Sequence, residues 1–385
     1  MDVKQLYNLV NTATQEVLGE QGLVKEDLSN LVDIGQAIAS AAGVDAYVRS
    51  LTNHIGKVIF VNRAYRGGAP SVLMDGWEFG SILEKIKIDH LPSATENESW
   101  ELQDGYSYDP NIFYKPSVSA KFFNKRITFE IDMSFTEKQV MQSFSNGSQL
   151  NAFTSMLYNA VDKSLTVKID ALIMRTINNM IGETAYAEAP SGTYSSRTGI
   201  KFVNLLYEYN TAFNKSLTLG DEVHDPDFIR FMSYRMGMTA ERMGKLSTLF
   251  NIGGTDKFTP SDMLHVVMLS DYAKAADAYL QSDTYHNEYT RLPNAETVPY
   301  WQGSGTGYAL SDVSEVKITT ASGHDVDITG VVGVMFDRDA LGVCNVDRRV
   351  TTNYNAKGEF YNNFFKFDAG YFNDTDENFV VFYCA

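Results

Sequence analysis

The most constraining feature of this sequence is a run of apolar residues between 148 and 181 that has the period of one long helix. Successive apolar positions lie three or four residues apart, which places them on one face of an α-helix. They are Leu150, Phe153, Leu157, Val161, Leu165, Ile169, Leu172, Ile173, Ile177, Met180 and Ile181. Asn146 and Ser148 can cap the first turn, and we expect Gly182 to end the helix in the left-handed conformation. Such a helix is about 50 Å long, so the rest of the fold must be arranged along it.

Two β-strands are predicted before this helix. Residues 82–88 read as one strand, and residues 127–135 alternate strictly between apolar and polar side chains. A period of two gives one apolar and one polar face, as in an antiparallel strand with one exposed side. The segment between the strands has little apolar periodicity and is long for a loop in a compact domain. We therefore predict an extended β-hairpin loop over residues 72–135, with a plain solvated hairpin as the alternative.

The segment between these strands is acidic in its first part and basic in its second. Its acidic residues are Glu96, Glu98, Glu101, Asp104 and Asp109, and its basic residues are Lys115, Lys121, Lys125 and Arg126. A segment with both signs of charge can bind neighbouring copies of the chain through ion pairs. These four basic residues, together with Trp77 and Phe79, are our candidate contacts between subunits.

The second half of the chain mixes helices and strands. Asp225 before Pro226 is a helix start, Phe202 and Leu205 begin another helical pattern, and residues 264–269 and 331–336 read as buried strands. After these, residues 348–354 and 360–367 flank a turn, and residues 379–383 form a last apolar strand. The acidic run 373–377 lacks the spacing of a calcium loop, so we expect a solvated turn there.

Neither the motifs nor the composition indicates catalysis. The six histidines form no HExxH pair, and the two cysteines, Cys344 and Cys384, form no CxxC, so no metal site and no cofactor are expected. No apolar run is long enough to span a membrane. The formal net charge of −16 makes the chain a poor binder of nucleic acid overall, although a local basic strip could still face DNA.

The order of these parts resembles the major capsid proteins of tailed phages with the Hong Kong 97-like fold, especially those of short-tailed phages of Gram-positive bacteria. Three stretches carry the resemblance: residues 48–61 with 77–82, residues 127–132 leading through Phe144 into the long helix, and residues 334–343 with the aromatic tail 354–383. The resemblance implies an α+β fold in five parts. They are an N-terminal arm with helices (1–71), the extended β-hairpin loop (72–135), the spine helix of a peripheral domain (136–197), a mixed axial domain (198–343) and a C-terminal β return (344–385).

The same resemblance implies a structural function rather than an enzymatic one. The chain would self-assemble as hexamers and pentamers into an icosahedral phage head, in the cytoplasm of a host bacterium. The expected partners are a scaffolding protein, a portal and packaged double-stranded DNA bound non-specifically on the inner face, with no membrane. An acidic wall can enclose DNA without binding it tightly. The alternatives are the shell of an encapsulin-like cargo compartment and a carbohydrate-active enzyme, which would also be acidic and rich in aromatic residues.

Overall fold

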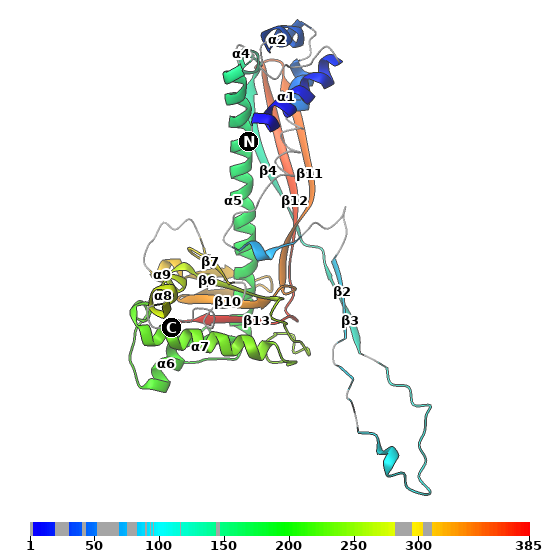
Figure 1. Cartoon of the computed structure of the whole chain (residues 1–385), viewed down its shortest axis with the longest axis vertical. Helices are drawn as coiled ribbons and strands as arrows, with labels where there is room; N and C mark the ends of the chain where they lie inside the picture. The colour runs from blue at the N-terminus through cyan, green and yellow to red at the C-terminus, as the bar shows by residue number, and fades with distance from the viewer. Residues whose placement is uncertain are drawn as a thin grey trace. The chain divides into compact units, whose positions relative to one another are not determined.

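The computed structural model of the chain describes residues 3–19, 31–40, 44–51, 69–74, 83–88, 91–92, 94, 96–115, 117–143, 147–281, 295–302 and 310–385. Figure 1 shows the course of the chain. It forms two compact units. Unit 1 comprises residues 1–80, 125–173 and 343–370, and unit 2 comprises residues 81–124, 174–342 and 371–385.

The predicted long helix is confirmed as α5, which runs from Gly147 to Glu188 over 42 residues. Its apolar positions from Leu157 to Ile181 are buried. The prediction that Gly182 ends the helix is wrong, because α5 continues for another turn and a half and stops just before Pro190. Gly182 has a packing role instead. A Cβ there would lie 2.9 Å from Cγ2 of Thr320 and 3.1 Å from Cγ2 of Ile318, so only glycine admits the segment around strand β8 (Val316–Thr319) this closely.

Unit 1 contains a sheet with the strand order β1-β11-β12-β4. The strands are β1 (Leu73–Met74), β11 (Leu341–Asn355), β12 (Phe360–Asn373) and β4 (Arg126–Thr136). Strands β4 and β12 pair antiparallel from Thr136 opposite Phe360 to Arg126 opposite Gly370. Phe135 on β4 meets Phe153 of α5 edge to face, with ring centroids 5.4 Å apart, which places the helix on this sheet. Helices α1 (Val3–Leu18), α2 (Leu31–Ser40) and α4 (Glu137–Ser143) and a helical stretch over residues 44–51 also belong to this unit, as does the 3-10 turn Pro70–Val72.

Unit 2 is built on a sheet with the order β5-β13-β10-β6-β7. The strands are β5 (Phe202–Asn204), β13 (Phe379–Tyr383), β10 (Val331–Asp337), β6 (Leu264–Leu269) and β7 (Ala295–Val298). Central β10 pairs antiparallel with β13 and β6, and every residue of β10 and β13 is buried. The three apolar runs read from the sequence at 264–269, 331–336 and 379–383 are therefore confirmed as core strands.

The helices of unit 2 begin largely where the sequence indicates. They are α6 (Leu205–Phe213), α7 (Pro226–Met243), α8 (Ser270–Gln281) and the short α9 (Leu310–Val313), with a 3-10 turn at Glu222–His224. Asp225 caps α7 as predicted, accepting hydrogen bonds from the backbone N–H groups of Asp227 and Phe228. The assignment of Phe202 to a helix is wrong. Its segment pairs with β13, and Asn204 then caps α6.

Two smaller sheets complete unit 2. Strands β8 and β9 (Asp325–Ile328) form a hairpin, and β2 (Leu83–Ile88) pairs antiparallel with β3 (Val118–Phe123). The strands predicted at 82–88 and 127–135 both exist, but they are not partners. The second of them is β4 of the unit 1 sheet, and β3, which pairs with β2, was not predicted from the sequence.

Candidate functional site

The segment from β2 to β3, residues 83–123, is called the arm here. Every side chain described between residues 91 and 117 is exposed, and Figure 1 draws this part in cyan as a long excursion with one 3-10 turn, Glu98–Trp100. Trp100 is 96% exposed and Phe113 is 84% exposed. Other large apolar side chains exposed in this segment are Leu91, Leu102, Tyr106, Tyr108, Ile112 and Tyr114. A series of uncovered rings on one segment is typical of surfaces that bind another molecule.

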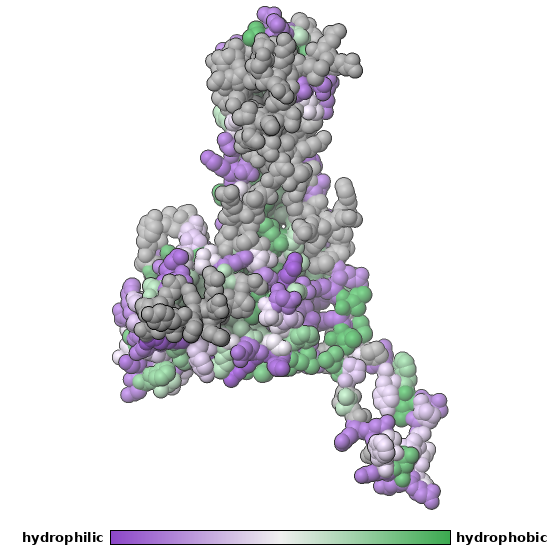
Figure 2. Space-filling view, in the orientation of Figure 1, coloured by the Kyte–Doolittle hydropathy of each residue, from purple (hydrophilic) through white to green (hydrophobic). Residues whose placement is uncertain are grey.

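The β2–β3 ribbon at the base of the arm has two chemically different faces. Residues opposite each other in the ladder share a face, so Lys85 lies beside Lys121 on one side, and Ile86 lies beside Ala120 on the other. Ile86 is 70% exposed, and Ile88, Val118 and Phe122 on the same face are exposed too. Figure 2 shows this hydrophobic colouring where the ribbon lies. The ribbon thus differs from an ordinary surface ribbon, because its three lysines turn inward and most of its apolar side chains turn outward.

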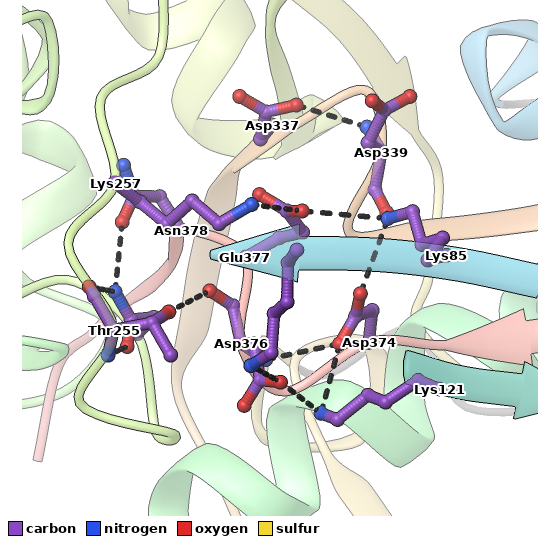
Figure 3. A network of polar contacts seen from close by, with 12 residues as sticks. Lys85, Lys121, Thr255, Lys257, Asp337, Asp339, Asp374, Asp376, Glu377 and Asn378 are labelled. Carbon is purple, nitrogen blue, oxygen red and sulfur yellow. Dashed lines mark hydrogen bonds and ion pairs between the residues drawn. The ribbon is translucent and has the colours of Figure 1, made fainter. Parts of the chain in front are cut away.

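The inward lysines meet an acidic segment between β12 and β13 (Figure 3). The whole cluster, called the ionic junction, consists of Lys85, Lys87, Lys121 and Lys257 with Asp374, Asp376 and Glu377. Lys85 Nζ lies 3.1 Å from Oδ2 of Asp374, and Lys121 Nζ lies 3.1 Å from Oδ1 of the same carboxylate. Lys121 Nζ also lies 2.5 Å from Oδ2 of Asp376, which Lys87 binds as well. Two carboxylates are therefore bound by three lysines of the arm.

The third carboxylate, that of Glu377, connects the ionic junction to Lys257 in the body of unit 2. Glu377 Oε1 lies 2.7 Å from Nζ of Lys257 and 3.4 Å from Nζ of Lys85. Lys85 in addition donates a hydrogen bond of 2.7 Å to the carbonyl oxygen of Asp339, in the turn that follows β10. Its ammonium also lies 5.6 Å from the centre of the Phe372 ring. One lysine thus joins the arm to two separate stretches of the chain, the segment 372–377 and the turn at Asp339.

Backbone contacts also hold the acidic segment, independently of the lysines. The N–H groups of Ile252 and Gly253 donate to the carbonyl oxygen of Thr375 at 3.0 and 2.9 Å. Thr255 Oγ1 donates to the carbonyl oxygen of Asp376 at 2.8 Å. A Cβ at Gly253 would lie 1.8 Å from Oδ1 of Asp376, so this position requires glycine. The loop 251–255 consequently holds the backbone of the acidic segment through contacts that do not involve the arm.

The junction is buried, so the prediction of a solvated turn at 373–377 is wrong. Asp374 is 2% exposed and Asp376 is 5% exposed. Burial raises the pKa of Asp376, but the hydrogen bonds and charges of Lys121 and Lys87 outweigh it and hold that pKa below its ordinary value. Burial likewise lowers the pKa of Lys121, while Asp376 and Asp374 raise it above its ordinary value. Both partners are therefore charged over the whole neutral range.

The six candidate contact residues fall in different places. Lys121 lies in the ionic junction, Lys115 is exposed in the arm, and Lys125 is exposed in the link to β4. Arg126 is the first residue of β4 and lies opposite Gly370. Trp77 and Phe79 lie outside the described residues. A contact between subunits at these positions stays a prediction.

Sequence reasoning missed Lys85 and Lys87 because the alternation in 83–88 assigns lysines to the wet face of a strand. The available signal was the acidic run 374–377, which has no cation within it and therefore needs basic partners from elsewhere once it is buried.

Comparison with known proteins decides the family. A family model described as Phi29-like phage major capsid protein matches residues 10–383. The chain belongs to this family. A search of curated proteins gives no match.

Chains in several solved phage structures are similar to this one. In a structure of native bacteriophage P68 with its head fibre and inner core protein, one chain is similar to this capsid protein at 10% identity. The match has a TM-score of 0.51 and covers 84% of this chain and 86% of that one. The capsid of Staphylococcus phage Andhra matches at 11% identity and a TM-score of 0.48, covering 84% and 86%. The capsid of cyanophage P-SCSP1u matches at 11% identity and a TM-score of 0.43, covering 84% and 90%.

This capsid protein is therefore a structural component of the phage head, and its place is the virion. Proteins of this kind self-assemble into shells, as the sequence led us to expect, and the mixed α+β fold is confirmed. The family assignment favours the phage head over the cargo compartment and the carbohydrate-active enzyme. Among the described residues, no helix combines the length and apolarity needed to cross a bilayer.

Proposed function

We propose that copies of this protein associate as hexamers and pentamers of the Hong Kong 97-like type and close an icosahedral head around double-stranded DNA. The arm is the part that binds a neighbouring copy. A separate scaffolding protein and a portal would direct closure, as the resemblance to tailed-phage capsid proteins implies. The role is mechanical and needs no catalytic residue.

The exposed rings of the arm are the observation that carries this proposal. A Phe or Trp side chain left in water forgoes roughly 1.5–3 kcal/mol relative to full burial. Trp100 and Phe113, at 96% and 84% exposure, are covered by no described part of their own chain. Self-assembly supplies the missing cover, because every neighbouring copy presents the same surfaces.

The net negative charge of the chain supports an inner capsid face that encloses DNA without binding it tightly. A formal net charge of −16 repels the phosphate backbone over most of the surface. Lys163 and Lys168 are exposed on α5, and weak contacts of this kind are compatible with non-specific binding of packaged DNA.

Truncating one ring at a time tests the arm. We expect Trp100→Ala and Phe113→Ala each to raise the subunit concentration at half-assembly about 10–100-fold, since 1.4 kcal/mol corresponds to a factor of ten. Light scattering and electron microscopy would follow shell formation under conditions in which the parent chain assembles. Asn111→Ala is the matched control, because Asn111 is exposed in the same segment but carries no apolar ring.

The unfolding free energy of the unassembled subunit should not change in any of the three variants, since the replaced side chains are exposed. If both ring variants close shells at the parent concentration, the arm does not bind a neighbouring copy through these side chains. A loss of subunit stability would show that the rings are part of the fold.

A further inference from the structure

We propose that the ionic junction positions the arm: Lys85, Lys87 and Lys121 set the direction in which the arm leaves unit 2. None of these lysines needs to touch a second copy. The inference rests on the proposed function in one respect, since a set direction matters only if the arm must meet a neighbour.

The first reason is that the carboxylates depend on the arm for their charge partners. Among the described residues, every cation within 4 Å of Asp374 or Asp376 comes from β2 or β3. Swinging the ribbon away would separate both carboxylates, which are 2% and 5% exposed in the docked structure, from all of these lysines, and breaking such buried ion pairs is unfavourable. Glu377 would keep Lys257 and is not dependent in this way. The docked direction is therefore favoured over others.

The second reason is geometric. Lys85 and Lys121 are opposite each other in the ladder and bind the two oxygens of Asp374 from the two strands. Lys87, two residues further along β2, binds Asp376 together with Lys121. Contacts from both strands, spread along the ribbon, fix its orientation, whereas one ion pair would permit rotation. At the base of the ribbon, the ring of Phe123 packs against that of Phe372, with centroids 5.2 Å apart.

The third reason is that the outward side chains of the ribbon do not attach it. Its other contacts with the body of unit 2 include the Phe123–Phe372 ring contact and a hydrogen bond of 3.4 Å from the N–H of Leu91 to Oδ2 of Asp256. Ile86, Ile88 and Phe122 point outward, so their burial contributes nothing to docking on the body of unit 2. The acidic segment is fixed independently by the N–H groups of Ile252 and Gly253. Removing the charges should therefore release the arm and leave the body of unit 2 folded.

The test measures arm direction in unassembled subunits. The double variant Asp374→Asn/Asp376→Asn keeps the size of both side chains and removes their charge. Spin labels at Ala120→Cys on β3 and Thr211→Cys on α6 report the direction of the ribbon, and a second pair at Thr211→Cys and Ala321→Cys reports the body. The native thiols, Cys344 and Cys384, are buried and do not compete for label. Asp327→Asn, which breaks the exposed Lys317–Asp327 ion pair of the same unit, is the matched control.

We expect the distance distribution from residue 120 to residue 211 to broaden in the double variant and not in Asp327→Asn, with the body distribution unchanged in all variants. Lys121→Met should broaden it as well, and Lys121→Arg should restore it because the guanidinium keeps the charge. If only one subunit in ten then holds the arm correctly, the half-assembly concentration rises about tenfold. An unchanged distribution in the double variant, or a body distribution that broadens equally, would overturn the positioning role. Neither result would affect the ring variants, which test the arm's contact separately.

Discussion

Two glycines inside helices of unit 2 should respond in opposite ways to the same substitution. Gly182 in α5 and Gly237 in α7 both lie within helices, where glycine is the least favourable residue apart from proline. A Cβ at Gly237 would meet nothing within 4 Å. A Cβ at Gly182 would meet the Cγ2 methyl groups of Thr320 and Ile318, the nearer at 2.9 Å. We expect alanine to stabilise the subunit at position 237 and to destabilise it at position 182.

The magnitudes follow from two opposing effects. Replacing an interior helical glycine by alanine gains about 0.8–1 kcal/mol through helix propensity, and this gain applies at both positions. Forcing a methyl group into a packed contact costs about 1–3 kcal/mol. The free energy of unfolding should therefore rise by about 1 kcal/mol in Gly237→Ala and fall by roughly 0–2 kcal/mol in Gly182→Ala. The difference between the two variants isolates the contact with the β8 segment.

Equilibrium urea unfolding of unassembled subunits, followed by fluorescence, measures this difference. Trp301 is a suitable reporter of unit 2, because it is fully buried and its Nε1 donates a hydrogen bond of 2.8 Å to the carbonyl oxygen of Val331. Equal stabilisation by the two substitutions would refute the reasoning, since it would mean that the β8 segment does not press on α5 at Gly182.

Two further predictions concern a helix cap and the pH range of the junction. Asp225→Ala should lower the free energy of unfolding by about 0.5–2 kcal/mol. Asp225→Asn should lower it less, because asparagine keeps an acceptor for the N–H of Asp227. Equal losses in urea unfolding would contradict the capping role. The ion pair between Asp376 and Lys121 should keep its strength across the neutral range, because the pKa of Asp376 lies below its ordinary value and that of Lys121 above it. It should be lost only in acid, as the pH falls through the lowered pKa of Asp376. The labels at residues 120 and 211 would report this, and release near neutral pH would contradict it.

Local periodicity was sufficient to predict the elements whose burial depends on their own sequence. The spacing from Leu157 to Ile181 predicts α5, and unbroken apolar runs predict β6, β10 and β13. Asp225 before Pro226 predicts the start of α7 because capping is a local interaction. The order of these elements was enough to indicate the capsid family.

The rest could not be predicted because distant segments decide it. Lys85 and Asp374 are 289 residues apart in the chain, and their ion pair holds the lysine face of β2 inward. No pattern within residues 83–88 could indicate that contact. From the sequence alone Gly182 is interpreted as a helix end, because the residues around it give no information about Thr320. The methyl group of Thr320 lies so close that glycine is required at position 182. Lys121 on β3 shares Asp374 with Lys85, and this contact too joins residues that no local pattern connects.

The outward apolar face of the β2–β3 ribbon has a consequence for the protein before it assembles. A two-stranded ribbon exposes hydrogen-bonding groups along both edges, and here it also exposes Ile86, Ile88 and Phe122. Such a surface favours non-specific association of newly made chains. Charge repulsion among chains of net charge −16 opposes that association and is weakened by salt. Solubility of the free subunit should accordingly fall as ionic strength rises, so productive assembly competes with aggregation from the moment of synthesis.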